Sequence, residues 1–198
     1  MKRLFLIFAI MVLLISNSSA MQNNIRNEMI LKINTALKIL KNKKENNSVK
    51  ANKIFKIFDK MFDYNLMARL SLGRNHWFAA NNIQRKKFVK EFISLLKESF
   101  MEKLKLYNNQ KMIVKKFNKS RKNRAELITY IVGEKNSIKV VYKFYKSQKR
   151  AWVIYDVIIA GVSIVQNYRE QFSDLLNNMS FKQFLNKINK INANNNNA

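Results

Sequence analysis

Residues 152–169 read Trp-Val-Ile-Tyr-Asp-Val-Ile-Ile-Ala-Gly-Val-Ser-Ile-Val-Gln-Asn-Tyr-Arg. The first half, through Ile159, is an apolar run rich in β-branched residues, which predicts a buried strand. Gly161 interrupts the run, and glycine adopts backbone angles that other residues avoid. After it, Val162, Val165 and Tyr168 recur at a spacing that suits one face of a helix. We therefore expect a strand that turns sharply into a helix, with both elements apolar toward the same interior.

Two groups of elements precede this stretch and one follows it. Apolar spacing predicts a helix at 22–41, a second helix capped by Ser48, and a short third helix between Asp63 and Gly73. After a loop at 74–81, Asn81 or Asn82 caps a long helix that runs to about Tyr107. Alternating apolar residues then predict strands at 112–117, 125–132, 138–145 and 151–159, and helices follow at 162–177 and 180–191.

The predicted fold class is α+β, because helices come first, strands joined by short turns follow, and helices close the chain. Short turns between successive strands imply a four-stranded antiparallel sheet. We expect one domain over residues 21–193 and a disordered tail at 194–198, where the sequence is a polar run of low complexity.

The first twenty residues have the pattern of a cleaved signal peptide. Lys2 and Arg3 form a basic start, residues 4–15 are apolar, and Ser18 and Ala20 are small residues of the kind that a signal peptidase recognises. The apolar run is too short to span a bilayer as a stable helix, although an uncleaved membrane anchor is the alternative. We expect a soluble exported protein, and a chain without cysteine then depends on its core for stability.

The chain is strongly basic, with 38 Lys and Arg against 12 Asp and Glu and a formal net charge of +26. Such a charge is typical of proteins that bind nucleic acid, anionic membranes or acidic partners. A biased composition rich in Lys, Asn and Ile is the competing explanation. Export argues against nucleic acid and leaves transient contact with an anionic membrane as the expectation.

Groups with catalytic potential are sparse. Asp156 is the one acid in its strand, and we interpret it as structural, paired with Arg69 or Arg169 or bonded to backbone near Gly161. The alternative is a general acid or base in a small exported enzyme, but no nucleophile accompanies it. With one His and no Cys, no His/Cys metal cluster is expected, and we predict neither a metal nor a cofactor.

Several stretches resemble the MlaC family of periplasmic phospholipid-binding proteins. They are residues 63–74 (DYNLMARLSLGR), 84–92 (QRKKFVKEF), 152–164 (WVIYDVIIAGVSI) and 167–172 (NYREQF). The order of elements matches through most of the mature chain. Two departures are a longer loop before Gln84 and the absence of a Pro usual at the start of the long helix.

The resemblance implies a periplasmic carrier that is not an enzyme. Such a protein shuttles phospholipid between an outer-membrane lipoprotein complex and an inner-membrane ABC transporter complex, and we expect a monomer with phospholipid as its cargo. It also implies an apolar cavity between sheet and helices for the acyl chains. Our candidate pocket residues are Leu66, Leu70, Phe88, Phe92, Leu95, Leu96, Ile138, Val140, Tyr142, Phe144, Trp152, Ile154, Val162 and Val165.

Two alternatives to this pocket stay open at the level of sequence. The same side chains are equally consistent with a packed core that they fill themselves, because periodicity does not reveal a cavity. A basic adaptor with a filled core, which binds membranes or proteins only by its surface, is the third functional hypothesis besides the carrier and the small enzyme.

Overall fold

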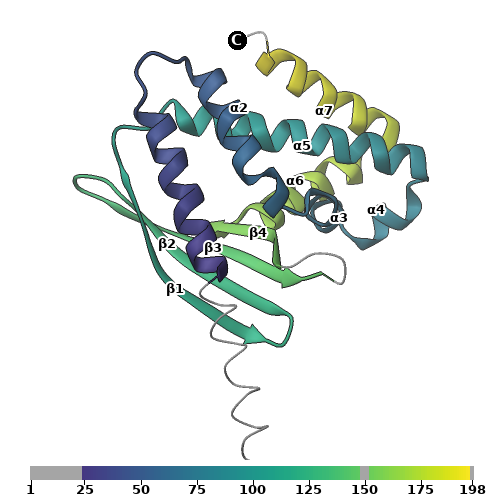
Figure 1. Cartoon of the computed structure of the whole chain (residues 1–198). Coiled ribbons are helices and arrows are strands. Elements are labelled where there is room, and N and C mark those ends of the chain that lie inside the picture. Colours follow the sequence, from purple (N-terminus) through teal and green to yellow (C-terminus); the bar gives the residue numbers. More distant parts are fainter. Residues whose placement is uncertain (1–23, 148–151, 197–198) are drawn as a thin grey trace, which may run out of the picture.

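The computed structural model describes residues 24–147 and 152–196 (Figure 1). The predicted signal peptide at 1–20 lies outside these residues, as does most of the predicted turn at 147–150. No helix within the described ranges combines the length and the apolar character needed to cross a bilayer.

The N-terminal helices lie close to their predicted positions. The first spans residues 24–41 and the second is α2 (Asn47–Phe58). The cap of α2 is Asn46 rather than the predicted Ser48, because the Asn46 side chain accepts a hydrogen bond from the Val49 N–H. A short 3-10 turn, η1 (Asp59–Met61), leads into α3 (Tyr64–Leu72). Asp63 caps α3 as predicted, and Gly73 ends it with a φ of +80°.

The predicted loop at 74–81 is wrong for most of its length, since residues Arg74–Ala79 form a short helix, α4. The long helix α5 (Asn82–Leu104) follows. Asn81 is its cap, with a reciprocal hydrogen bond from the Asn81 N–H to the Gln84 side chain that completes a capping box.

The sheet is an antiparallel meander in the order β1-β2-β3-β4-β5. Its strands are β1 (Lys111–Arg121), β2 (Arg124–Val132), β3 (Ser137–Lys146), β4 (Trp152–Ile159) and β5 (Val162–Ser163). The four predicted strands are all present. The fifth was missed because it has only two residues, which pair with the end of β4 after the turn at Gly161.

Two helices complete the chain, α6 (Ile164–Asn178) and α7 (Phe181–Asn196). Val162 was predicted to lie on the helix, but it belongs to β5 and is 58% exposed. The last helix runs five residues beyond the predicted end at Ile191, so that three residues of the predicted disordered tail are helical.

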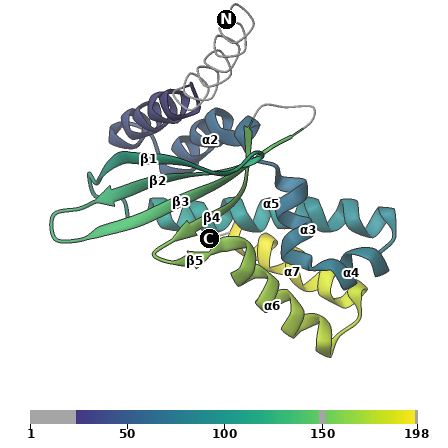
Figure 2. The same ribbon diagram turned by 90° about the horizontal axis from the view of Figure 1, so that it is seen from below.

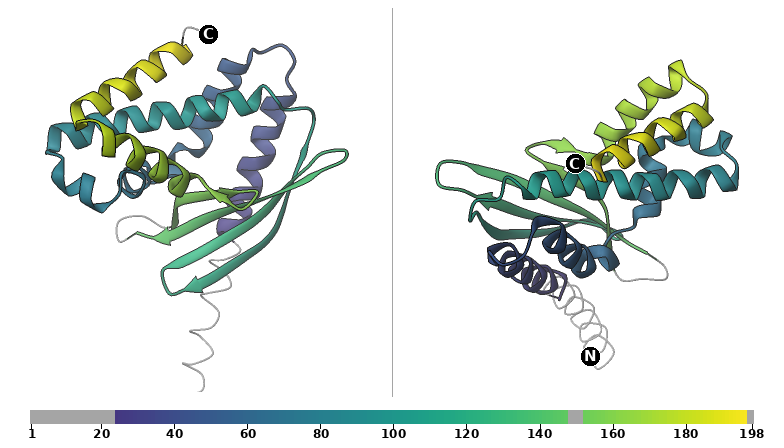
Figure 3. Two further views of the ribbon diagram at one scale, coloured as in Figure 1. Left: turned by 180° about the vertical axis from the view of Figure 1, so that it is seen from behind. Right: turned by 90° about the horizontal axis from the view of Figure 1, so that it is seen from above.

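The molecule divides into a sheet layer and a bundle of helices (Figures 1 and 2). The helix at 24–41 crosses one face of the sheet, whereas α5 and α7 lie side by side in the bundle, on the far side of β4 (Figure 3). Two buried clusters correspond to these parts. One joins the sheet to the helix at 24–41, and the other joins α3, α5, α6 and α7.

The α+β class is thus confirmed, but one predicted contact is wrong. Phe88 and Phe92 of α5 were expected to face the sheet, and instead they lie in the core of the helical bundle. Among the residues that the structure describes, only Phe62 and Ile164, both partly buried, pack against both clusters.

Candidate functional site

The candidate site is one face of the sheet together with the helix that covers it. Alternation along each strand directs every second side chain to this face, and the antiparallel register aligns them. Leu127 of β2, for example, lies opposite Phe117 of β1 and Tyr142 of β3. The residues of this sheet face, which we call the apolar face, are Met112, Val114, Phe117, Ala125, Leu127, Ile131, Val140, Tyr142, Phe144, Trp152, Ile154, Val157 and Ile159.

The helix at 24–41 supplies the cover of the apolar face. Ile25, Met29 and Ile33 recur along one side of this helix and are buried in the same cluster as the strand residues. Met61, with Phe58 partly buried beside it, adds to the cover where α2 ends. Lys32 holds this helix to α2, since its ammonium group donates to the Ile57 carbonyl over 2.8 Å. The helix and α2 therefore form one connected lid.

Burial falls off from one end of the apolar face to the other. At one end, Phe144 and Ile154 are fully buried. At the other end, Ile131 is only half-buried and Ile138, its partner across β2 and β3, is 41% exposed. On the covering helix, Met29 and Ile33 are buried and Leu37 is partly buried against the same cluster. The layer is thus closed near Trp152 and open near Ile138.

Tyr142 lies midway along the apolar face. Its side chain is only partly buried, yet desolvation by burial raises the pKa of its phenol from 10.0 to about 12. A phenol in open water would keep its ordinary pKa.

Trp152, at the closed end, carries an unusual polar group. Its indole Nε1–H is buried and has no hydrogen-bond partner in the structure. An unpaired buried donor carries a desolvation cost of about 1–3 kcal/mol.

The second cluster, in contrast, is filled by aromatic rings. Phe172 contacts Phe88 at 5.5 Å and Phe184 at 5.3 Å between ring centroids, both edge to face. Phe92 packs in the same way against Tyr168, at 5.5 Å. Such interlocked rings form a rigid core. Phe88 and Phe92 were predicted from sequence as pocket residues, and the structure places them in this aromatic core.

The fourteen predicted pocket residues are thus divided between the two parts of the molecule. Val140, Tyr142, Phe144, Trp152 and Ile154 share the apolar face of the sheet. Leu70, Phe88, Phe92, Leu95, Leu96 and Val165 belong to the helical cluster, and Leu66 is half-buried on α3. Ile138 lies at the open end of the layer, and Val162 is exposed outside it.

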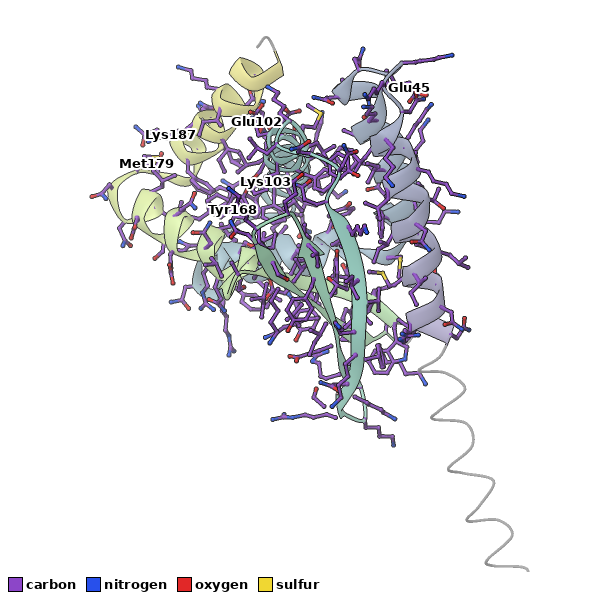
Figure 4. All side chains as sticks on the ribbon, turned by 90° about the vertical axis from the view of Figure 1, so that its left-hand side faces the viewer. Glu45, Glu102, Lys103, Tyr168, Met179 and Lys187 are labelled. Atoms are coloured by element: carbon purple, nitrogen blue, oxygen red, sulfur yellow. The ribbon has the colours of Figure 1, made fainter. Side chains whose placement is uncertain are left out.

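The helical bundle has a hollow of its own. A space of about 350 Å³ lies between α5, α6 and α7, where Leu95, Phe172 and Ile188 contribute apolar side chains. Tyr168, labelled in Figure 4, faces α5 from α6 at this place, and burial raises the pKa of its phenol. A smaller hollow of about 190 Å³ lies near His76 and Phe181. Neither hollow is lined by a residue of the sheet.

Asp156 has a structural role in its surroundings. Its carboxylate is buried and accepts hydrogen bonds from the Ser163 hydroxyl, at 2.8 Å, and from the Val165 N–H, at 3.2 Å. Ser163 in turn caps α6 by accepting from the Gln166 N–H. The predicted bond to backbone near the Gly161 turn is confirmed. Neither arginine named as a candidate partner, Arg69 or Arg169, forms an ion pair with it in the part of the chain that the structure describes.

Sequence reasoning missed the cover and eight of the thirteen strand residues of the apolar face. The spacing of Ile25, Met29 and Ile33 marked a helix face, but nothing indicated that this face meets the sheet. The alternation of Met112 with Val114, and of Ala125 with Leu127, was the signal for the rest of the apolar face. Among the described residues there is no group of three or more His, Cys, Asp or Glu side chains able to hold a metal ion.

Fold and site together define a class of protein: an α+β domain in which one sheet face is covered by the helix at 24–41 over an apolar layer. The family model described as MlaC protein matches residues 32–190. The chain belongs to the MlaC family.

Two known proteins are similar to this chain. The intermembrane phospholipid transport system binding protein MlaC of Haemophilus influenzae is 25% identical over 109 residues, which are 53% of this chain and 51% of that protein. This chain therefore matches about half the length of that curated relative. The solved structure of the phospholipid-binding protein from Ralstonia solanacearum, in complex with a phospholipid, superposes with a TM-score of 0.73 at 19% identity and covers 86% of this chain and 97% of that one. This second likeness confirms the fold.

Proposed function

We propose that this protein is a periplasmic carrier that holds the acyl chains of a phospholipid between the apolar face and the helix at 24–41. The observation that carries the proposal is the partial exposure of apolar side chains along a layer that is covered and closed at one end. The carrier passes its lipid between an outer-membrane lipoprotein complex and an inner-membrane ABC transporter complex.

The comparisons support the cargo. The relative from Haemophilus influenzae is named for intermembrane phospholipid transport, and the solved relative from Ralstonia solanacearum holds a phospholipid. Each acyl methylene moved out of water contributes about 0.8 kcal/mol, so that two chains of about 15 carbons represent on the order of 20 kcal/mol. A carrier must therefore enclose most of both chains, and a sheet face of apolar residues with a lid is suited to this.

The proposed seat differs in part from the pocket predicted from sequence. Acyl chains lie along Val140, Tyr142, Phe144, Trp152 and Ile154, with Ile138 at the entrance. The side chains of the helical cluster support the seat from outside it, and Val162 takes no part. The headgroup remains in water beyond the entrance, so that selectivity for the headgroup is weak.

Release of the lipid requires the lid to move away from the sheet. The helix at 24–41 is joined to α2 by a polar turn at 42–46 and by the bond from Lys32 to the Ile57 carbonyl, so the two helices move as one. Binding to a transporter partner triggers this movement. No step of the cycle uses a catalytic residue.

Two neighbouring residues of β1 provide a matched test of the seat. Val114 points to the apolar face and is partly buried, whereas Ile113 is 39% exposed and points to the opposite face. We expect Val114→Glu to reduce co-purified phospholipid at least about tenfold, because a carboxylate beside an acyl chain carries a large desolvation cost. Ile113→Glu adds the same charge one residue away and is expected to leave the lipid content unchanged.

The measurement is phospholipid extracted per mole of folded protein, with circular dichroism as the check on folding. Equal lipid content in both variants would remove the acyl chains from this face of the sheet. A larger loss in Ile113→Glu would place them on the opposite face.

A further inference from the structure

The first residue of β2, Arg124, lies against two aromatic rings at the end of the sheet. Its guanidinium carbon is 5.4 Å from the ring centroid of Tyr145 and 5.0 Å from that of Tyr155. The two rings meet edge to face at 6.1 Å. Both tyrosines are partly buried, and the arginine side chain is half-buried with them. These three residues, which we call the arginine shelf, form a small fixed platform.

The shelf is anchored to the body of the protein. The Tyr145 hydroxyl donates to the carboxylate of Asp63, the same side chain that caps α3. The Asp63 N–H in turn donates to the Ile154 carbonyl of β4 over 2.9 Å. The ring beneath the guanidinium therefore has a set position, and stacking on aromatic faces leaves the N–H edge of arginine available.

Positive charge is concentrated around the shelf without acidic partners. Arg121 lies directly opposite Arg124 in the pairing of β1 with β2, an arrangement of like charges that is destabilising in an antiparallel sheet. The Lys146 N–H donates to the Asn123 carbonyl, which brings the end of β3 to the same turn. Residues 111–124 contain seven Lys and Arg and no Asp or Glu.

Nearby acids do not neutralise this charge. Glu126, two residues further along β2, lies opposite Lys143 of β3 and forms no ion pair within 4 Å. The four ion pairs within the described ranges all lie in the helices and the connections between them, at distances of 2.6 to 3.7 Å. Arg124 is thus a partly desolvated cation with Arg121 opposite it, and it takes part in none of the ion pairs found among the described residues. The Asp63 carboxylate that anchors the shelf accepts from the Tyr145 hydroxyl.

We propose that the arginine shelf binds phosphate groups of anionic phospholipids at a bilayer surface. The planar guanidinium presents two parallel N–H donors that match two phosphate oxygens, and Arg121 with Lys122 adds attraction for an anionic surface. The shelf lies outside the acyl-chain layer, since none of its residues belongs to the buried cluster there. A variant can therefore lose binding to a bilayer and keep its carried lipid, or lose the lipid and keep binding to a bilayer.

The test uses the purified full chain and co-sedimentation with vesicles. Vesicles of phosphatidylglycerol and phosphatidylcholine in equal parts are compared with vesicles of phosphatidylcholine alone. We expect Arg124→Gln to weaken binding to the anionic vesicles about tenfold, the scale of one charge-assisted bond. The charge-matched control is Lys135→Gln, at an exposed position in the turn between β2 and β3 at the other end of the sheet, where we expect a change of less than about twofold.

A second variant separates geometry from charge. Arg124→Lys keeps the charge but loses the planar fork, and we expect it to weaken binding at least about threefold. Thermal unfolding of each variant verifies that the fold is intact. Equal losses in Arg124→Gln and Lys135→Gln, or wild-type binding by Arg124→Lys, would overturn the proposal, because net charge would then suffice.

Two further results would also overturn it. If the wild-type protein does not bind anionic vesicles, the occupant of the shelf is an acidic protein surface instead. If Arg124→Gln loses its co-purified phospholipid, the shelf binds the headgroup of the carried lipid and not the bilayer. Absence of any phospholipid in the wild-type protein would refute the proposed carrier function while leaving the vesicle result to stand.

Discussion

At the scale of single residues, Tyr142 gives the most direct information about the apolar layer. Its phenol keeps some accessible surface, and burial still raises its pKa to about 12. A tyrosine in a filled core would be fully enclosed, and one on an outer surface would titrate near 10. Tyr142 is therefore a largely desolvated phenol within the apolar layer.

The raised pKa of Tyr142 leads to a prediction about alkaline pH. Because the folded protein favours the neutral phenol, Tyr142 contributes fully to the free energy of unfolding below pH 10. This contribution is lost as the pH rises from 10 toward 12. The loss is on the order of 2–3 kcal/mol in the free energy of unfolding. Urea unfolding of wild type and Tyr142→Phe between pH 8 and 12 measures it, with the wild type falling more steeply.

Other buried tyrosines do not affect the difference in stability between wild type and Tyr142→Phe. Burial also raises the pKa of Tyr64 and Tyr168, and both are common to the two proteins. The difference between the two stability curves thus isolates Tyr142. Parallel curves throughout this range would mean that its phenol is not desolvated in the folded state.

Asp156 shows how much a single residue could be interpreted in advance. An acid in an apolar strand predicted a buried carboxylate with a compensating partner. The turn at Gly161 limited where that partner lies, and the Val165 N–H fulfils the expectation. The Ser163 hydroxyl was not predicted, because the helix start was placed one residue before it rather than one residue after it.

At the scale of elements, Gly73 decides how α3 ends and α4 begins. Its backbone has φ +80° and ψ 158°, a region that is open essentially only to glycine. The Gly73 N–H donates to the Arg69 carbonyl, and its own carbonyl accepts from Trp77. One residue thus links the two helices.

We expect Gly73→Ala to lower the free energy of unfolding by about 1–3 kcal/mol. The cost is backbone strain, since a Cβ there would meet Arg169 at 3.6 Å, an ordinary contact. Gly133→Ala is the matched control, because that glycine has no positive φ and its added Cβ also meets its neighbour at 3.6 Å. Urea midpoints measure both, and equal midpoints would contradict the assignment of strain to Gly73.

The strands and the caps of two helices were predictable because their signals are local. Alternation fixed β2 to within one residue at its start, Asp63 was recognised as a cap from its side-chain chemistry, and Asn81 was one of the two candidate caps of α5. The helix α4 was missed because six residues around His76 and Trp77 show no apolar periodicity. The predicted contact of α5 with the sheet was wrong for another reason. Spacing identifies an apolar face of a helix but not the element that this face meets.

At the scale of the whole molecule, the separation into two apolar clusters is the main result. The core of the helices is packed with aromatic rings, as between Phe88 and Phe172, and a hollow of about 350 Å³ lies beside it. The sheet layer, in contrast, is covered by one helix and opens at one end. In the proposed function, the helices that cover this layer move away from the sheet while the bundle keeps its packing.

The structure also shows where part of the positive charge of the molecule lies. A net charge of +26 alone predicts only attraction to anionic surfaces. The structure adds a fixed arginine on two tyrosine rings at one end of the sheet, which is a feature that composition could not indicate. The candidate lipid seat was likewise predicted in part, since five of its residues were named from sequence and the covering helix was not.

The central claim is that the layer between the sheet and the helix at 24–41 holds a phospholipid. The most direct test is solvent extraction and mass spectrometry of the full chain, secreted to the periplasm of a bacterial host and purified without detergent. The account predicts phospholipid in a simple ratio to protein, lost in Val114→Glu and kept in Ile113→Glu. Folded wild-type protein that yields no phospholipid, and takes up none from vesicles, would contradict it.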